Sequence, residues 1–118
     1  MRTNSGFPPR SHTRKELLKF ILQRGGAVAY TAEMCDEMAI RCHLQSSARA
    51  RVDKDGRNRW ANELRWCREE LVEIGYLESD GPNRKDEAIW TLTESGIEQA
   101  EEAMTFTFNG VKYSLGYR

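Results

Sequence analysis

Apolar residues recur along most of this chain at the three- and four-residue spacing of amphipathic helices. The clearest stripe predicts a helix that Asn58 caps at its start and that Gly75 ends. The residues of this helix that should face a core are Trp60, Leu64, Cys67, Leu71 and Ile74.

The same periodicity predicts three further helices, over residues 13–24, 31–44 and 94–104. Thr31 and Thr93 are suitable N-caps for the second and the last of these helices. Helix-forming sequence therefore occupies most of the chain.

Short strands and loops are predicted between the helices. Residues 27–30 indicate a short strand, and the polar segment 45–57 indicates a loop. Residues 76–78 and 89–92 are expected to pair antiparallel as a two-stranded wing, because turn-forming residues separate them. The tip of this wing carries Arg84 and Lys85.

These elements predict an α+β fold, a winged helix-turn-helix with a three-helix core and a two-stranded wing, an extra C-terminal helix and a terminal β-hairpin. A length of 118 residues suits one such domain. We expect residues 1–12 to form a flexible arm, residues 13–104 the winged-helix domain and residues 105–118 the hairpin.

The hairpin is predicted because Asn109-Gly110 stands between two runs of alternating apolar and polar residues. An isolated hairpin would leave its apolar face in water. We expect this face to pack on the protein's own helices, and the alternative is a surface for a homodimer or another partner. The face comprises Phe106, Phe108, Val111, Tyr113 and Leu115.

Charge is distributed unevenly although the net charge is zero. Residues 41–68 hold eight arginines or lysines and three acids, a balance of +5, whereas residues 69–104 hold two basic residues and eleven acids, a balance of −9. The two basic residues of the acidic segment belong to the wing tip. A polyanion would therefore meet the helix at residues 58–75 and the wing first.

The outward side of that helix carries residue types that suit base edges in a major groove, where arginine pairs with guanine, asparagine with adenine and glutamate with cytosine. The competing interpretation is an ordinary solvated helix face. We expect Trp66 to pack beneath the wing beside Trp90 rather than to contact a base. The candidate base-reading residues are Asn58, Asn62, Arg65, Trp66 and Glu69. The candidate phosphate contacts are Arg41, Arg49, Arg51, Arg57, Arg59 and Arg68.

Metal binding and catalysis find little support in the sequence. Cys35, Cys42 and Cys67 could be drawn with His43 as a zinc site, but they form no close Cys-x-x-Cys pair and suit buried apolar positions better. The other histidine, His12, accompanies no nucleophile motif, and no glycine-rich phosphate loop is present. We expect no metal, no cofactor, no small-molecule substrate and no enzymatic activity.

The run NELRWCREELVEIGYLE, followed by IWTLTESG, resembles the amino-terminal winged-helix domain of Mrr-type restriction endonucleases. The family pattern has Arg-Trp-Ala in its third helix, a Leu five residues after that Trp, a Gly-Leu-Leu exit and a Trp-x-Leu/Ile-Thr-x-x-Gly return. Cys67 replaces the usual Ala here, and Tyr76 replaces the first Leu. The matching residues are Arg65, Trp66, Leu71, Gly75, Leu77, Trp90, Leu92, Thr93 and Gly96.

This resemblance covers residues 14–104. The run is more distantly similar to the winged-helix modules fused to methyl-directed restriction enzymes, and this similarity implies binding to DNA, with modified DNA as one alternative. The nuclease half of the family has no counterpart in these residues, and the terminal hairpin departs from the pattern. We expect a cytoplasmic protein, without a signal or membrane segment, that binds double-stranded DNA in a sequence- or modification-dependent way. It would act as a small regulator or as the recognition module of a restriction or defence system. The alternative is a protein-interaction module that uses the acidic fourth helix and the apolar hairpin.

Overall fold

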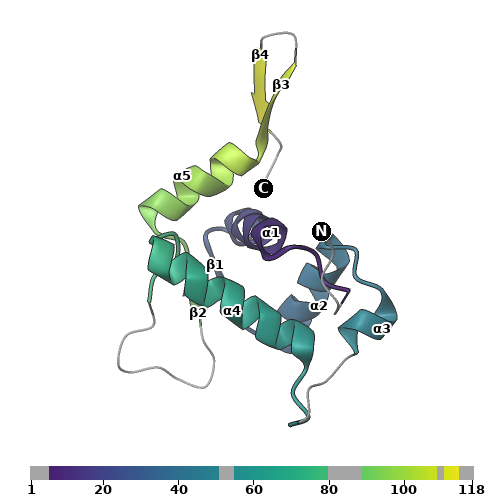
Figure 1. The fold of residues 1–118 in the computed structure, drawn as a ribbon. Coiled ribbons are helices and arrows are strands. Elements are labelled where there is room, and N and C mark those ends of the chain that lie inside the picture. Colours follow the sequence, from purple (N-terminus) through teal and green to yellow (C-terminus); the bar gives the residue numbers. More distant parts are fainter. Residues whose placement is uncertain (1–5, 51–54, 80–88, 109–110, 115–118) are drawn as a thin grey trace.

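The computed structural model describes residues 6–50, 55–79, 89–108 and 111–114, and it leaves out the side chains of residues 106–108 and 112–114. The fold is α+β, as the sequence predicts. Figure 1 shows the helices and strands that these ranges contain. They are α1 (Arg10–Gln23), β1 (Ala27–Ala29), α2 (Ala32–Arg41), α3 (Ser46–Arg49), α4 (Arg59–Ile74), β2 (Ile89–Thr91), α5 (Glu94–Ala103), β3 (Thr105–Phe108) and β4 (Val111–Ser114).

The predicted helix caps are confirmed. The Thr31 hydroxyl accepts a hydrogen bond from the Met34 amide, at 3.1 Å, at the start of α2. Asn58 caps α4 in the same way by accepting from the amide three residues later, at 2.9 Å. Gly75 ends α4 with a φ of 102°, a left-handed conformation in which a side chain would be strained.

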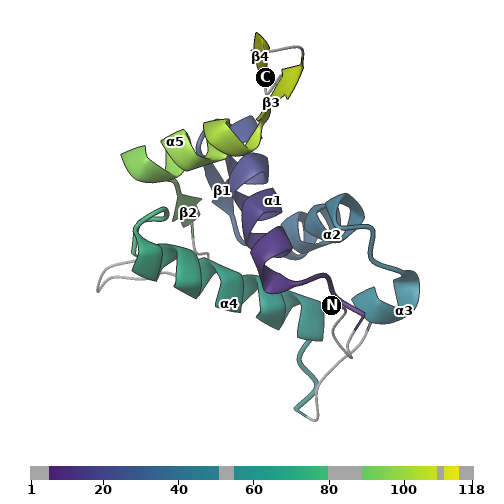
Figure 2. The ribbon, with the colours of Figure 1, turned by 45° about the horizontal axis from the view of Figure 1, so that its top comes forward.

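The core lies where α1 packs against α2, α4 and α5 (Figure 2). Four of the five predicted inward residues of α4 are buried, but Ile74 is 53% exposed. Leu77, which follows the turn at Gly75, is buried instead. Other fully buried residues of the core include Leu17, Ile21, Met38 and Ala100.

The central sheet brings three segments together. β1 pairs antiparallel with β2, and Val28 faces Trp90 in this register. On the other edge of β2, Leu77 forms a bridge with Leu92, and the Glu78 amide donates to the Thr91 carbonyl at 2.9 Å. The predicted pairing of residues 76–78 with the return strand is therefore present as one bridge, and the wing tip, with Arg84 and Lys85, lies outside the described residues.

Two sequence-based expectations about loops are wrong. Residues 7–12 do not form a loose arm, because α1 begins at Arg10 and Phe7 is buried against Trp60 with 5.2 Å between the ring centroids. The apolar Phe7 side chain ties this segment to α4. The expected loop at 45–57 contains the short helix α3, whose Ala48 is buried.

The terminal hairpin has the predicted register, with Phe108 opposite Val111 and Phe106 opposite Tyr113. Figures 1 and 2 show β3 and β4 extending beyond the end of α5, away from α4. The expected packing of this hairpin against the helices is therefore wrong. The side chains of its predicted apolar face, apart from the exposed Val111, lie outside what the structure describes.

Candidate nucleic-acid interface

One side of α4 faces the core and the opposite side faces solvent. Arg65, Trp66 and Glu69 are exposed on the outer side, together with the N-cap Asn58, and Asn62 is half-buried there. The sequence placed these five residues on one outward side, and the structure agrees. The hairpin leaves this side uncovered because it extends from the far end of α5 (Figure 1).

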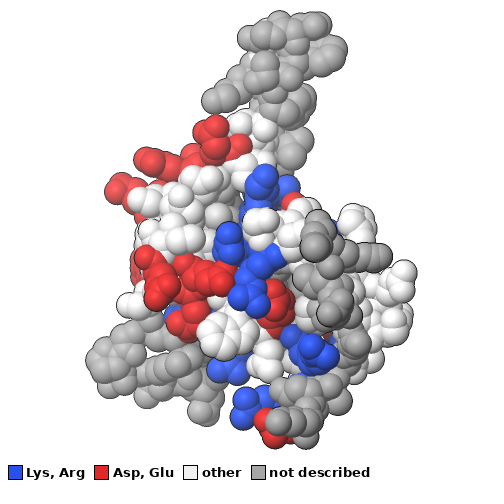
Figure 3. Space-filling model, viewed as in Figure 1, with Lys and Arg blue, Asp and Glu red and all other residues white. Residues whose placement is uncertain are grey.

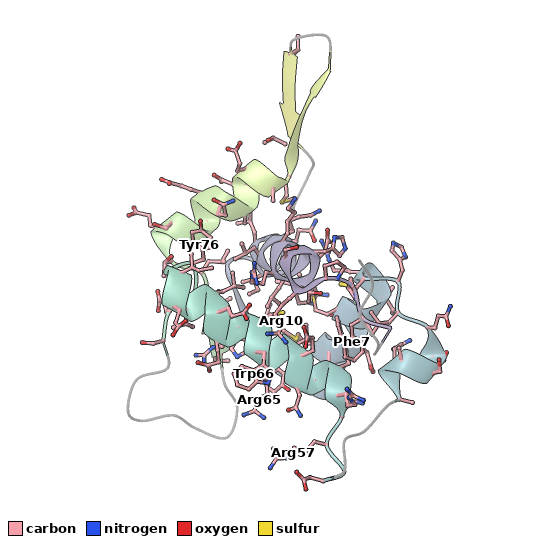
Figure 4. All side chains as sticks on the ribbon, viewed as in Figure 1. Phe7, Arg10, Arg57, Arg65, Trp66 and Tyr76 are labelled. Atoms are coloured by element: carbon pink, nitrogen blue, oxygen red, sulfur yellow. The ribbon has the colours of Figure 1, made fainter. Side chains whose placement is uncertain are left out.

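Four of these residues line a pocket with a volume of about 220 Å³. Its walls are the side chains of Arg57, Asn62, Arg65, Trp66 and Glu69. In Figure 4 the labelled side chains of Arg57, Arg65 and Trp66 extend from the same side of α4 and of the segment that precedes it. The structure thus places Arg57, which was predicted as a phosphate contact, beside four of the residues predicted to read bases.

Trp66 does not pack beneath the wing beside Trp90, as the sequence suggested. It is 60% exposed, whereas Trp90 is 2% exposed and stacks on Tyr30 with 4.8 Å between the ring centroids. The phenol of Tyr30 also donates a hydrogen bond to the Ala61 carbonyl of α4, at 3.1 Å. Tyr30 therefore occupies the position against Trp90 that was expected for Trp66.

Arg68 is not a phosphate contact, because its side chain is buried next to the core. It follows Cys67 on the inward side of α4, and the burial includes the Nε and Nη2 atoms of its guanidinium. Its guanidinium donates to Glu69 Oε2 at 2.7 Å. Arg68 thus holds one oxygen of a carboxylate that lines the pocket.

The other predicted phosphate contacts that the structure describes have different surroundings. Arg59 is exposed at the first turn of α4, and Arg51 lies outside the described residues. Arg49 forms a long salt bridge, 3.4 Å, with Asp36 of α2. Arg41 is half-buried, bonds Gln23 and pairs with Glu16 at 3.4 Å, so the structure places it against α1 rather than at the pocket.

The surface charges are separated in space as well as in sequence. Figure 3 shows most acidic side chains over α5 and the C-terminal half of α4, with lysine and arginine side chains over α1 and around the N-terminal half of α4. The exposed acids of this region are Glu69, Glu73, Glu94, Glu98, Glu101 and Glu102. The pocket lies at the border between the two regions, with two arginines and one glutamate in its wall.

An ion-pair network between α1 and α4 was not anticipated from the sequence. Arg10 Nε donates to Glu63 Oε2 at 2.8 Å and Arg10 also bonds Glu70 at 3.0 Å, while Arg14 bonds Glu70 at 2.7 Å. Hydrogen bonding to Glu63 raises the pKa of Arg10 further above its usual range despite burial. Burial of Glu70 works to raise its pKa, but the bonds from Arg10 and Arg14 outweigh this effect and lower it.

This network fixes α4 on α1 and draws Glu63 and Glu70 away from the outer side of α4. The signal in the sequence is the spacing, because Arg10 and Arg14 are four residues apart and Glu63 and Glu70 are seven apart. Each pair therefore occupies one helix face, but the sequence alone does not tell which faces meet.

The three cysteines are buried and free, as predicted. Burial raises the pKa of Cys35 and of Cys42 to about 11 and that of Cys67 to about 12. They are therefore protonated thiols near neutral pH. Within the described ranges, no group of three His, Cys, Asp or Glu side chains is arranged to hold a metal ion.

None of the helices that the structure describes combines the length and the apolar character needed to cross a lipid bilayer.

Comparison with known proteins identifies one family. The family model described as the Mrr N-terminal domain matches residues 11–102. No curated protein and no solved structure matches the chain significantly.

Proposed function

Because the chain belongs to the family of Mrr N-terminal domains, we propose that it binds double-stranded DNA through the outer side of α4. The family points to a module related to restriction systems. In that setting the chain recognises DNA, by sequence or by base modification, and carries out no chemistry of its own. The same activity would suit a small regulator.

The proposal includes a winged helix-turn-helix arrangement. The order α1, β1, α2, α4, β2, with β2 pairing with β1 on one edge and bridging to Leu77 on the other, is compatible with that fold. α4 takes the place of the recognition helix, which enters the major groove in such folds. The residues between Ser79 and Ile89 would form the wing, and Arg84 and Lys85 remain predictions from sequence.

The observation that carries this proposal is the set of polar side chains on the outer side of α4. Arg65 is exposed and, among the residues that the structure describes, has no salt bridge, so its guanidinium can pair with a guanine. Asn62 and Glu69 supply an amide and a carboxylate for base edges. Arg57 and Arg59 lie at the start of the same helix, where they can neutralise phosphates.

The test is a binding titration with fluorescently labelled duplexes at low salt, using a randomised library with and without base methylation. We expect Arg65→Ala to weaken binding by about 1–3 kcal/mol and to relax base preference. Arg24→Ala is the charge-matched control, because Arg24 is 48% exposed but lies outside the pocket and pairs with Glu37. Absence of any duplex affinity at low salt would overturn the proposal.

A second candidate function is protein recognition through the opposite end of the molecule. It is favoured by the acidic surface of α5 (Figure 3) and by the hairpin that extends beyond it. Such a surface suits a basic partner, and the hairpin suits a second copy of the chain. A solution mass measurement distinguishes a monomer from a homodimer, and it bears on this function alone.

A further inference from the structure

The pocket on α4 contains a large aromatic side chain that the reading of base edges does not explain. Trp66 is 60% exposed, while the other two tryptophans, Trp60 and Trp90, are each 2% exposed. Indole has one hydrogen-bond donor and no acceptor, so its edge reads base edges poorly. What it offers is a flat aromatic surface on which another ring can stack.

The remaining walls of the pocket are suited to the polar edge of such a ring. Glu69 supplies a carboxylate, and the 2.7 Å bond from the buried Arg68 to its Oε2 restricts the position of this group. Asn62 adds an amide with both a donor and an acceptor. Arg57 and Arg65 place positive charge at the same pocket, where the phosphate of a nucleotide whose base is the stacked ring would be neutralised.

A nucleotide combines these properties: its base is a flat aromatic ring with a polar edge, and its sugar carries a phosphate. In an intact duplex, however, the faces of each base are covered by its neighbours. The indole of Trp66 can stack on a base only when that base has left the helical stack.

We propose that this pocket binds one unstacked base of the DNA held on α4, and that it favours cytosine or adenine, the two bases whose exocyclic amino group lies on the major-groove edge. The amino group donates to the Glu69 carboxylate, and the ring stacks on Trp66. This inference rests on the proposed function, since it concerns the same surface. It adds that the preferred substrate is DNA with an unpaired or easily unpaired base.

The experiment compares three duplexes of the same sequence: one fully paired, one with a single cytosine opposite an abasic site, and one with a single thymine at that position. We expect the wild-type protein to bind the unpaired-cytosine duplex about tenfold more tightly than the paired duplex. The unpaired thymine should bind less tightly than the cytosine, because it presents a carbonyl oxygen to the Glu69 carboxylate.

Variants of the pocket separate its two contacts. Trp66→Ala should abolish the preference for the unpaired base, and Trp66→Tyr should retain most of it because tyrosine also stacks. Glu69→Gln should reduce the discrimination between cytosine and thymine, since an amide both donates and accepts. Ile74→Ala is the matched control, because Ile74 is another exposed apolar residue of α4, 53% exposed, and does not line the pocket.

Tryptophan fluorescence gives an independent readout. Since Trp60 and Trp90 are buried, an added quencher such as iodide reaches mainly Trp66. Binding of the unpaired-cytosine duplex should protect Trp66 from iodide more than binding of the paired duplex does.

The possible outcomes separate this inference from the function on which it rests. Equal affinity for the paired and unpaired duplexes would overturn the inference and leave DNA binding intact. So would a Trp66→Ala variant that loses affinity for all three duplexes by the same factor. If the wild-type protein binds none of the duplexes at low salt, the proposed function fails and the inference fails with it.

Discussion

Gly96 shows how one residue can decide whether two elements fit together. A Cβ atom at this position of α5 would lie 2.0 Å from the carbonyl oxygen of Tyr76, which belongs to the turn after α4 (Figure 4). Thr93 joins the same two elements, because its hydroxyl donates to the Gly75 carbonyl at 2.6 Å and accepts from the Gly96 amide at 3.0 Å. Both residues belong to the family motif, and their roles here are structural.

Gly96→Ala should destabilise the protein by about 2 kcal/mol or more, although alanine usually stabilises a helix by about 1 kcal/mol over glycine. The reason is that backbone atoms of Tyr76 would have to move. Urea denaturation measures the difference. Ser95→Ala, at the exposed neighbouring position, should change stability by less than about 0.5 kcal/mol. A Gly96→Ala variant as stable as the wild type would show that the approach of α5 to Tyr76 is wrong.

Thr93→Val should cost about 1–2 kcal/mol, since it removes the N-cap of α5 and the bond to the end of α4 while keeping the shape of the side chain. Thr93→Ser keeps the hydroxyl and serves as the control. Thermal denaturation of both variants checks this prediction. A Thr93→Val variant that melts at the same temperature as Thr93→Ser would contradict it.

At the level of elements, α4 has two different sides, each with its own role. Its inner side packs in the core and reaches α2 through the Trp60 indole N–H, which donates to the Cys35 carbonyl at 2.9 Å. Its flank is held on α1 by Arg10 and Arg14. These contacts fix the rotation of α4 about its axis, and this rotation decides which side chains face solvent.

The α1–α4 network should make stability depend on pH. The pKa of Glu70 is lower in the folded protein, so its contribution is present above the pKa of the unfolded chain and is lost as the pH falls through the folded value. Its side chain is 35% exposed, so the contribution at pH 7 is about 1 kcal/mol or less. Glu70→Gln should therefore be less stable than the wild type at pH 7, and the two should converge as the pH falls through the folded pKa of Glu70.

The exposed Glu73 on the same helix provides the comparison for this prediction. Glu73→Gln should leave the difference between the free energies of unfolding at pH 7 and pH 3 nearly the same as in the wild type. Chemical denaturation at both pH values measures these free energies. If the free energies of unfolding of Glu70→Gln and of the wild type differ by the same amount at both pH values, the network does not stabilise the fold.

At the level of the whole molecule, the separation of charge is the main feature. A neutral chain presents an acidic end, over α5 and the end of α4, and arginines around the start of α4 (Figure 3). Such a distribution can orient an approaching polyanion although the net charge gives no attraction. The orientation would place α4 rather than α5 against the DNA.

DNA affinity should therefore fall with salt, with a slope of log K against log salt concentration of about −0.9 for each phosphate contacted. Arg59→Gln should reduce the steepness of this slope by about 1 and weaken binding to DNA of any sequence by the same factor. Arg24→Gln should leave the slope unchanged. Titrations between low and moderate salt give these slopes, and a salt-independent affinity would argue against phosphate contacts.

The sequence by itself determined the local elements, because their signals are local. Apolar periodicity, the caps Thr31, Asn58 and Thr93, and the register of β3 with β4 depend on residues only a few positions apart. The outward side of α4 could be predicted in the same way, since one helix wheel defines it. The family motif added the class of fold and of function.

Only the tertiary structure decided which surfaces meet. Burial of Phe7 on Trp60, of Arg68 beside the core and of Trp90 on Tyr30 all depend on contacts between distant segments. Such contacts arise from packing, and a polar or apolar residue type does not reveal its neighbour. For this reason the sequence named the residues of the pocket, while the exposure of Trp66 at its centre became evident only from the folded chain.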